Sequence, residues 1–253
     1  MLPEEYLMNI AIIFAGGTGS RMNSKETPKQ FLTLCNKPII IHTIEYFEKH
    51  PLIDAIVVAC IQNWMDYFKT LVSRYNLKKV KRVVPGGATG QLSIYHGLKA
   101  ANELDPSGKS IVLIHDGVRP LINERVITDN IDSVLTTGSA ITTGKVTETI
   151  LVVNPNDSSI EQVPQRDQSR MAKAPQSFWL KDILSVHEKA LEEGRTNYID
   201  SCTMMQQYGF QLHLIEGPIE NIKITTPCDY YIARAIIEAK ENDLIYEIGE
   251  KTI

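Results

Sequence analysis

The stretch IAIIFAGGTGSRM at residues 10–22, followed by Pro28-Lys29-Gln30, decides the fold of this chain. Its isoleucine-rich start predicts a buried strand of a parallel sheet. Three glycines within four positions then predict a backbone that turns sharply and lies close to a ligand. Successive amides in such a loop can converge on an anion. Because Arg21 and Lys29 add two positive charges, the stretch predicts a binding site for a nucleotide triphosphate.

The common phosphate-binding loops do not fit these residues. A dinucleotide fingerprint needs a glycine three residues after Gly19, where this chain has Met22. A Walker loop ends in Gly-Lys-Ser/Thr, and Lys29 comes too late in the chain for that role. An ordinary tight turn between a strand and a helix stays an alternative, but the two cations favour phosphate binding.

Composition is that of an ordinary globular protein, with 253 residues, 43% of them hydrophobic and 22% charged. The net charge of −4 argues against a nucleic-acid coat or a basic membrane-surface protein. The acidic start does not resemble a signal peptide, and no apolar stretch approaches the roughly 20 residues of a membrane span. We therefore expect a cytoplasmic protein that binds neither nucleic acid nor membrane.

The four cysteines are far apart in the sequence and form no Cys-x-x-Cys pair: Cys35, Cys60, Cys202 and Cys228. We expect buried free thiols. The six histidines are also scattered, and none pairs with an acidic residue in a zinc motif. Nucleophilic cysteine chemistry and zinc binding therefore have no support in the sequence.

Apolar runs alternate with amphipathic stretches, which predicts an α/β fold with a Rossmann-like, mostly parallel sheet covered by helices. We expect one domain over residues 1–253. The predicted strands are 9–15, 55–60, 80–84, 110–115, 139–145, 211–216 and 221–225. The predicted helices are 38–49, 63–75, 91–104, 123–136, 180–193 and 228–240.

Residues 146–172 interrupt this alternation and are rich in polar side chains. Two β-like pieces, 149–153 and 159–163, flank Asn154-Pro155-Asn156-Asp157, which predicts a hairpin with a turn at its tip. A long hairpin outside the core often embraces another subunit. A solvent-exposed segment that contacts no other subunit stays an equal alternative.

Further candidate residues follow the later strands, because ligands of open α/β sheets bind at the carboxyl ends of the strands. A second glycine-rich loop, residues 85–93, opens a helix, and its amides with the Ser93 hydroxyl could hold a base or a phosphate. Asp116 ends the next strand and is a natural Mg²⁺ ligand. The alternative is that Asp116 only caps its loop by pairing with Arg119.

Lys223 lies in a short apolar stretch near the C-terminus, just before Thr225-Thr226-Pro227. Lysines in strands usually point to solvent. Lys223 comes between Ile222 and Ile224, immediately before a predicted helix start, and could instead face the crevice.

Taken together, these segments resemble the cytidylyltransferases that act on sugar-alcohol phosphates. The resemblance extends over residues 9 to 234, in the order of the family. It rests on Ala15 to Met22, Pro28-Lys29-Gln30-Phe31, Gly86-Gly87, His115 to Pro120, Pro175-Gln176-Ser177-Phe178 and Asn221 to Thr225.

The resemblance implies a nucleotide-diphospho-sugar transferase fold, a homodimer clasped through the 146–172 arms, and CMP transfer from CTP to a polyol phosphate with Mg²⁺. The family pattern places CTP against Phe14, Ala15, Gly16, Gly17, Gly19, Gly87, Ala88, Thr89 and Ser93. The implied catalytic residues are Arg21 and Lys29 at the transition state, and Arg166 and Lys223 at the acceptor phosphate. Asp116 matches the metal ligand, whereas Thr149 and Asp200 match substrate contacts.

Three positions depart from this pattern. Gly90 stands where most relatives carry arginine, and Ala174 and Ile199 stand where threonine is usual. The acceptor is therefore less certain than the reaction. Trp64 after the second strand favours D-ribitol 5-phosphate, a precursor for teichoic acid or capsule, although the tryptophan could simply be core packing. The alternative acceptor is 2-C-methyl-D-erythritol 4-phosphate of isoprenoid synthesis.

Two other classes stay open. A dinucleotide-dependent oxidoreductase would also begin with a strand and a glycine-rich loop, but it needs an acidic residue after its second strand, where this chain has Cys60-Ile61-Gln62. A nucleotide-binding scaffold without activity is the other alternative, which Gly90 makes conceivable.

Overall fold

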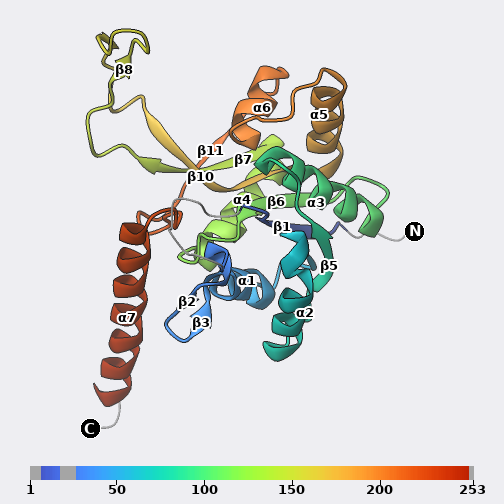
Figure 1. The fold of residues 1–253 in the computed structure, drawn as a ribbon, viewed down its shortest axis with the longest axis vertical. Coiled ribbons are helices and arrows are strands. Elements are labelled where there is room, and N and C mark those ends of the chain that lie inside the picture. Colours follow the sequence, from blue (N-terminus) through green and yellow to red (C-terminus); the bar gives the residue numbers. More distant parts are fainter. Residues whose placement is uncertain (1–6, 18–26, 251–253) are drawn as a thin grey trace.

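A seven-stranded sheet forms the centre of the computed structural model, which describes residues 7–17 and 27–250, with 243–250 as backbone only. The strand order is β11-β7-β10-β6-β1-β4-β5. The strands are β1 (Asn9–Ala15), β4 (Ala55–Cys60), β5 (Val80–Pro85), β6 (Ile111–Asp116), β7 (Ser139–Lys145), β10 (Arg170–Trp179) and β11 (Leu214–Glu216). Every neighbouring pair is parallel except the two that involve β10. The predicted α/β fold with a mostly parallel sheet is confirmed (Figure 1).

Helices cover both faces of this sheet. One layer contains α1 (Ile39–Lys49), α2 (Met65–Arg74) and α4 (Glu124–Thr137), and the other contains α3 (Gly90–Leu104), α5 (Leu180–Glu192) and α6 (Ser201–Gln207). The alternation of side chains along β1 explains the two layers, because successive residues of a strand point to opposite faces. Ala11 and Ile13 pack against the first layer, whereas Ile10 and Ile12 pack against the second.

Three parts of the sheet differ from the sequence prediction. Residues 221–225 form an irregular loop and not a strand, and the predicted strand 211–216 is reduced to β11. The antiparallel β10 was not predicted. Its first half contains Arg170 and Lys173, and Pro175 lies where the pairing with β7 shifts register between Ala172 and Gln176. A strand interrupted by proline in this way has no clear alternating pattern. Helix α6 was also not predicted.

The predicted hairpin is confirmed, although its strands are short. β8 (Val152–Val153) pairs antiparallel with β9 (Ile160–Gln162), and the arm projects beyond the sheet (Figure 1). Helix α7 (Pro227–Glu250) is longer than expected and also extends away from the body. Over the described parts of the chain, none of the helices combines the length and the apolar character that a membrane crossing requires.

Smaller elements connect the first strands. They are the 3-10 turns η2 (Lys29–Phe31) and η3 (Gln62–Trp64) and the short pair β2 (Thr33–Leu34) and β3 (Lys37–Pro38). The cysteines are free thiols, as predicted, but they are not all buried. Cys60 is buried, Cys35 and Cys202 are partly buried, and Cys228 is exposed at the start of α7.

Candidate active site

The two glycine-rich loops touch each other at the carboxyl ends of β1 and β5. A Cβ atom added to Gly16 would lie 2.5 Å from Ser93 Oγ, and one added to Gly86 would lie 2.9 Å from the Gly16 Cα. Both distances are too short for a side chain, so glycine is required at 16 and 86 by close packing of the loops. The structure thus brings the two predicted nucleotide-binding loops together.

Ser93 shapes the second loop from within. Its buried hydroxyl accepts a hydrogen bond from Gly87 N at 3.0 Å and donates to Thr89 O at 3.0 Å. Thr89 in turn caps α3, since its Oγ1 accepts from Leu92 N at 3.2 Å. These bonds fix the backbone of Gly87, Ala88 and Thr89. A nucleotide contact of these residues stays a prediction.

Lys29 is placed beside the first loop by its neighbours in η2. Gln30 is buried, and its Nε2 donates to Ala15 O at 2.6 Å and to Gly17 O at 3.3 Å. The Phe31 ring stacks on Trp64 with centroids 5.0 Å apart. Trp64 therefore has the packing role that was the alternative to its use as a mark of the ribitol 5-phosphate acceptor. Gly19 and Arg21, predicted for the same loop, lie outside the described residues.

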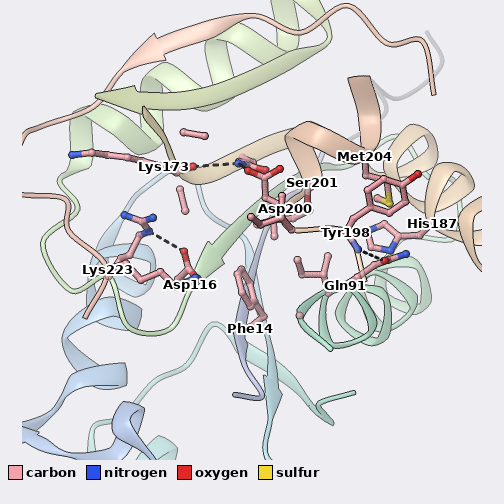
Figure 2. A pocket seen from close by; sticks show the side chains of 18 residues that line it. Phe14, Gln91, Asp116, Lys173, His187, Tyr198, Asp200, Ser201, Met204 and Lys223 are labelled. Atoms are coloured by element: carbon pink, nitrogen blue, oxygen red, sulfur yellow. Dashed lines mark hydrogen bonds and ion pairs between the residues drawn. The ribbon is translucent and has the colours of Figure 1, made fainter. Parts of the chain in front are cut away.

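A pocket of about 340 Å³ opens at the carboxyl ends of β1 and β6 (Figure 2). Asp116 and Lys223 lie on one side of Phe14, and Asp200, Tyr198 and His187 lie on the other. The lining is Phe14, Gly90, Gln91, Ile94, Ile114, Asp116, Arg119, Ala172, Lys173, Ala174, Gln176, His187, Tyr198, Ile199, Asp200, Ser201, Met204 and Lys223. All three departures from the family pattern, Gly90, Ala174 and Ile199, line this pocket.

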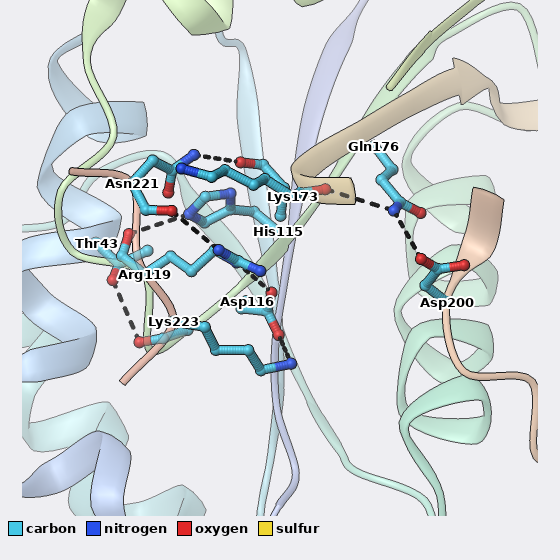
Figure 3. A network of polar contacts seen from close by, with 11 residues as sticks. Thr43, His115, Asp116, Arg119, Lys173, Gln176, Asp200, Asn221 and Lys223 are labelled. Carbon is cyan, nitrogen blue, oxygen red and sulfur yellow. Dashed lines mark hydrogen bonds and ion pairs between the residues drawn. The ribbon is translucent and has the colours of Figure 1, made fainter. Parts of the chain in front are cut away.

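The cationic end of the pocket is built around Asp116, which is only 5% exposed. Its Oδ2 accepts from Arg119 Nε at 2.8 Å, and Lys223 Nζ lies 2.5 Å from its Oδ1 (Figure 3). Burial alone would raise the pKa of Asp116, but Lys223 and Arg119 outweigh it and hold the pKa at about 2. The expected pairing with Arg119 is therefore present. Lys223 faces the crevice as predicted, although it lies on a loop.

Asp116 also fits the predicted role of metal ligand. Its carboxylate stays ionised inside the pocket, which is what a hard cation such as Mg²⁺ requires. Within the described residues there is no group of three or more His, Cys, Asp or Glu side chains that could hold a metal ion. A cation at Asp116 would thus need further oxygen ligands from a bound nucleotide, which is common for Mg²⁺.

The opposite end of the pocket is formed by Asp200, which caps α6. Its Oδ1 accepts from Thr203 N at 2.8 Å and its Oδ2 from Gln176 Nε2 at 3.3 Å. Gln91, which the sequence gave no reason to select, holds the preceding segment. Its Nε2 donates to Arg195 O at 2.8 Å and its Oε1 accepts from Tyr198 N at 2.8 Å.

His187 and Lys173 are two further lining residues that were not predicted. Burial lowers the pKa of His187 to about 4, and neither ring nitrogen has a hydrogen-bond partner among the described residues. His187 is thus a neutral side chain in the wall of the pocket. Lys173 stands between Ala172 and Ala174, directly after the segment predicted as the arm. Its position between small apolar residues was the one available signal.

The arm residues lie away from this pocket in the single chain. Arg166 Nη2 donates to Thr149 Oγ1 at 3.3 Å, and both side chains are exposed on the arm. Neither of them lines the pocket around Asp116. In this arrangement the two side chains contact each other and lie outside the pocket of their own chain.

Related proteins identify the chemistry. A Ribitol-5-phosphate cytidylyltransferase from Streptococcus agalactiae is 55% identical over 240 residues, which is 95% of this chain and 99% of the relative. A 2-C-methyl-D-erythritol 4-phosphate cytidylyltransferase from Clostridium botulinum is 36% identical over 91% of this chain and 97% of its own. A crystal structure of the 4-diphosphocytidyl-2C-methyl-D-erythritol synthase from Anaerococcus prevotii superposes with a TM-score of 0.79 at 27% identity. The superposition covers 92% of this chain and 99% of that one.

The fold and these relatives define an enzyme of the nucleotidyltransferase class, specifically a cytidylyltransferase. The family model described as IspD, 2-C-methyl-D-erythritol 4-phosphate cytidylyltransferase, matches residues 9–239, and the chain belongs to this family. The predicted resemblance is confirmed. The alternative of a dinucleotide-dependent oxidoreductase is not supported by these relatives.

Proposed function

We propose that this protein transfers CMP from CTP to D-ribitol 5-phosphate, giving CDP-ribitol and pyrophosphate. One observation carries the choice of acceptor. This chain is 55% identical to a relative named for ribitol 5-phosphate and 36% identical to a relative named for 2-C-methyl-D-erythritol 4-phosphate. The matches cover 99% and 97% of the two relatives. The pocket supports the chemistry, because a cationic end suits a phosphate and a polar end suits hydroxyl groups.

The reaction forms one phosphorus–oxygen bond and breaks another. An oxygen of the acceptor phosphate attacks the α-phosphorus of CTP, and pyrophosphate leaves with the electron pair of the bond between the α- and β-phosphates. The acceptor phosphate is already an anion at neutral pH, so no general base is required. Catalysis of this kind rests on positioning and on stabilising charge in the transition state. In this chain Lys29, beside the first glycine loop, and Lys223, in the pocket, supply such charge.

We assign Asp116 as the residue that holds Mg²⁺, together with phosphate oxygens of CTP. When bound, the ion neutralises part of the triphosphate charge. Lys223 occupies one Asp116 oxygen in the absence of ligands, at 2.5 Å. Once it leaves this oxygen, its ammonium group is available to the acceptor phosphate. Arg119 is more deeply buried and stays on the second oxygen, where it orients the carboxylate.

We further propose a homodimer in which the arm, residues 146–172, reaches the pocket of the partner. Two observations support it. The arm exposes apolar side chains that a monomer would leave in water: Leu151, Val153, Ile160 and Val163. In addition, Arg166 and Thr149 lie outside the pocket of their own chain. In a dimer of this kind Arg166 would bind the acceptor phosphate from across the interface.

The experiment is a pyrophosphate-release assay with CTP, Mg²⁺ and one acceptor at a time. The proposal expects release with D-ribitol 5-phosphate, and the product should have the mass of CDP-ribitol. A much higher kcat/KM with 2-C-methyl-D-erythritol 4-phosphate would favour the second candidate, to which the family model and the Clostridium relative point. If the protein bound CTP but released no pyrophosphate with either acceptor, it would be the inactive scaffold.

A further inference from the structure

The loop that carries Lys223 has no regular secondary structure of its own. Residues 217–226 connect β11 with α7, and their backbone groups must find partners elsewhere. Lys223 can serve the acceptor phosphate only if this loop holds its ammonium group at this end of the pocket, next to Asp116. The contacts that fix the loop are therefore part of the catalytic arrangement.

The second half of the loop is fixed by two neutral contacts and by two charged groups, Arg119 and Asp229. Asn221 is buried and its Nδ2 donates to Ala174 O at 2.7 Å, while its own carbonyl accepts from Arg119 Nη1 at 3.0 Å. Ile224 N donates to Val118 O at 2.9 Å. At the end of the loop, Asp229 Oδ2 accepts from Thr226 N at 2.7 Å and ties it to α7.

The first half of the loop is held by Gly217 N, which donates to Thr143 O at 2.8 Å, and by the side chain of Lys173. Its Nζ donates to Pro218 O at 2.9 Å and to Ile219 O at 3.0 Å. Lys173 lies where β10 shifts register against β7, between Ala172 and Gln176. A bulge of this kind turns a side chain away from the regular alternation. Here the bulge directs Lys173 to the loop that carries Lys223.

Lys173 occupies this place at an energetic cost. Only 9% of the residue is exposed, and none of the described carboxylates forms an ion pair with it. Burial lowers the pKa of Lys173, and the nearby Arg119 lowers it further, whereas Glu220 acts in the opposite direction. Burying an ammonium group without a carboxylate is unfavourable. A neutral donor would bind a carbonyl oxygen at a lower desolvation cost. The positive charge of Lys173 therefore needs an explanation beyond the two hydrogen bonds.

Gly144 on the neighbouring strand β7 makes room for the Lys173 side chain. A Cβ atom added at this position would lie 2.8 Å from Lys173 Cε and 3.3 Å from its Nζ. The obstructed atoms are the flexible end of a side chain, so alanine at 144 would displace Lys173 and leave the strand intact. Position 144 thus offers a way to move the ammonium group without removing it.

We propose that Lys173 is a positioning residue for catalysis: it holds the carbonyls of Pro218 and Ile219 so that Lys223 reaches Asp116 and the acceptor phosphate. Its charge also keeps the potential at this end of the pocket positive, next to Arg119 and Lys223. The role rests on the proposed function. Lys173 acts through Lys223 and does not itself touch the reacting atoms.

The test compares K173M, K173R and G144A with wild type, and uses K181M, an exposed lysine on α5, as the control. In K173M the KM for the acceptor should rise about tenfold or more while the KM for CTP changes less than about twofold, because only the acceptor phosphate relies on Lys223. K173R retains the donors and the charge and should recover most of the loss. G144A should show part of the K173M defect, and K181M none.

Hydrogen exchange of the peptide covering residues 217–224 provides a readout that needs no acceptor. Exchange should be faster in K173M and G144A than in wild type, and close to wild type in K173R. Unchanged exchange with an unchanged acceptor KM in K173M would overturn the proposal. A loss of thermal stability with equal effects on both substrates, not recovered by K173R, would also overturn it. If wild type turns over no polyol phosphate, the proposed function fails, and the exchange data still decide the role of Lys173.

Discussion

Lys223 Nζ lies 2.5 Å from Asp116 Oδ1. This ion pair joins the predicted metal ligand, Asp116, to the predicted acceptor-binding cation, Lys223. Arg119 holds the second oxygen at 2.8 Å. The side chain of Lys223 is 40% exposed, whereas that of Arg119 is 12% exposed. If a cation that binds Asp116 displaces one of the two, we expect the more exposed Lys223 to be the one that yields. Metal binding and the release of Lys223 are then coupled.

The first prediction tests metal binding by Asp116 and acceptor binding by Lys223 separately. In K223M the KM for the acceptor should rise at least about tenfold, because a charge-assisted hydrogen bond to its phosphate is lost. Binding of Mg²⁺ with CTP, measured by calorimetry, should be unchanged or tighter, because one oxygen of Asp116 no longer has a competing partner. D116N should show the reverse pattern, with weaker metal binding.

The control for these two variants is K69M, because Lys69 is exposed on the surface of α2, where it pairs with Asp66. It should leave both measurements unchanged. If K223M weakened metal binding and left the acceptor KM as in wild type, the competition at Asp116 would be refuted.

The second prediction concerns Lys29. K29A should lower turnover at least about a hundredfold, equivalent to about 3 kcal/mol in the barrier, which is typical for the loss of one preorganised donor. The fold should stay intact, because Gln30 and Phe31 hold the 3-10 turn through the bonds to Ala15 and Gly17 and the stacking on Trp64. The readouts are pyrophosphate release and the melting temperature. Turnover like that of wild type would remove Lys29 from the mechanism.

The third prediction tests whether the arm acts across a dimer interface. R166A and K223M should each have low activity. When both chains are unfolded together and refolded as mixed dimers, activity should return to about a quarter of wild type, because half of the dimers then hold one unaltered site. If Arg166 served its own chain, every site would carry a defect and mixing would restore nothing.

The complementation test needs a measurement of oligomeric state. Light scattering should give the mass of a dimer for wild type and both variants. Replacing exposed arm residues Val153 and Ile160 by aspartate should shift the mass toward a monomer and lower activity together. A monomeric wild type with full activity would exclude the arm-exchanged dimer.

Sequence reasoning was reliable where local signals determine the structure. The isoleucine run followed by glycines places β1 and its loop, and Asp116 ends β6 because strand and turn residues meet there. Lys223 was placed at the crevice although its segment is not a strand. Its apolar neighbours Ile222 and Ile224 are partly or fully buried, as in a strand. The backbone of the loop does not pair with a strand: Ile222 N donates within the loop to Glu220 O, and Ile224 N donates to Val118 O.

The residues that the sequence did not reveal act through contacts between distant segments. Gln91 and Tyr198 are 107 positions apart, and Lys173 and Pro218 are 45 apart. Such pairs depend on the order of strands in the sheet and on the bulge in β10, neither of which has a local signature. The same holds for the arm, whose residues Thr149 and Arg166 carry no sign of which chain they serve.

The last prediction uses His187 in the wall of the pocket. Burial lowers its pKa from 6.5 to about 4, so the folded state resists protonation while the unfolded state accepts a proton near pH 6.5. The unfolded state therefore binds more protons between these values, and stability must fall as pH falls from 6.5 toward 4. At pH 5 the cost from His187 amounts to about 2 kcal/mol of the free energy of unfolding, relative to pH 7.5.

Replacing His187 by leucine removes this titration. Neither ring nitrogen has a partner among the described residues, so an apolar side chain of similar size should cost little at pH 7.5. Denaturant unfolding at both pH values should show that H187L loses about 2 kcal/mol less than wild type on acidification. H187F should show the same reduced loss despite its different packing, because the effect depends on the missing titration and not on shape. Parallel losses in wild type and both variants would mean that His187 is already solvated enough to titrate normally in the folded enzyme.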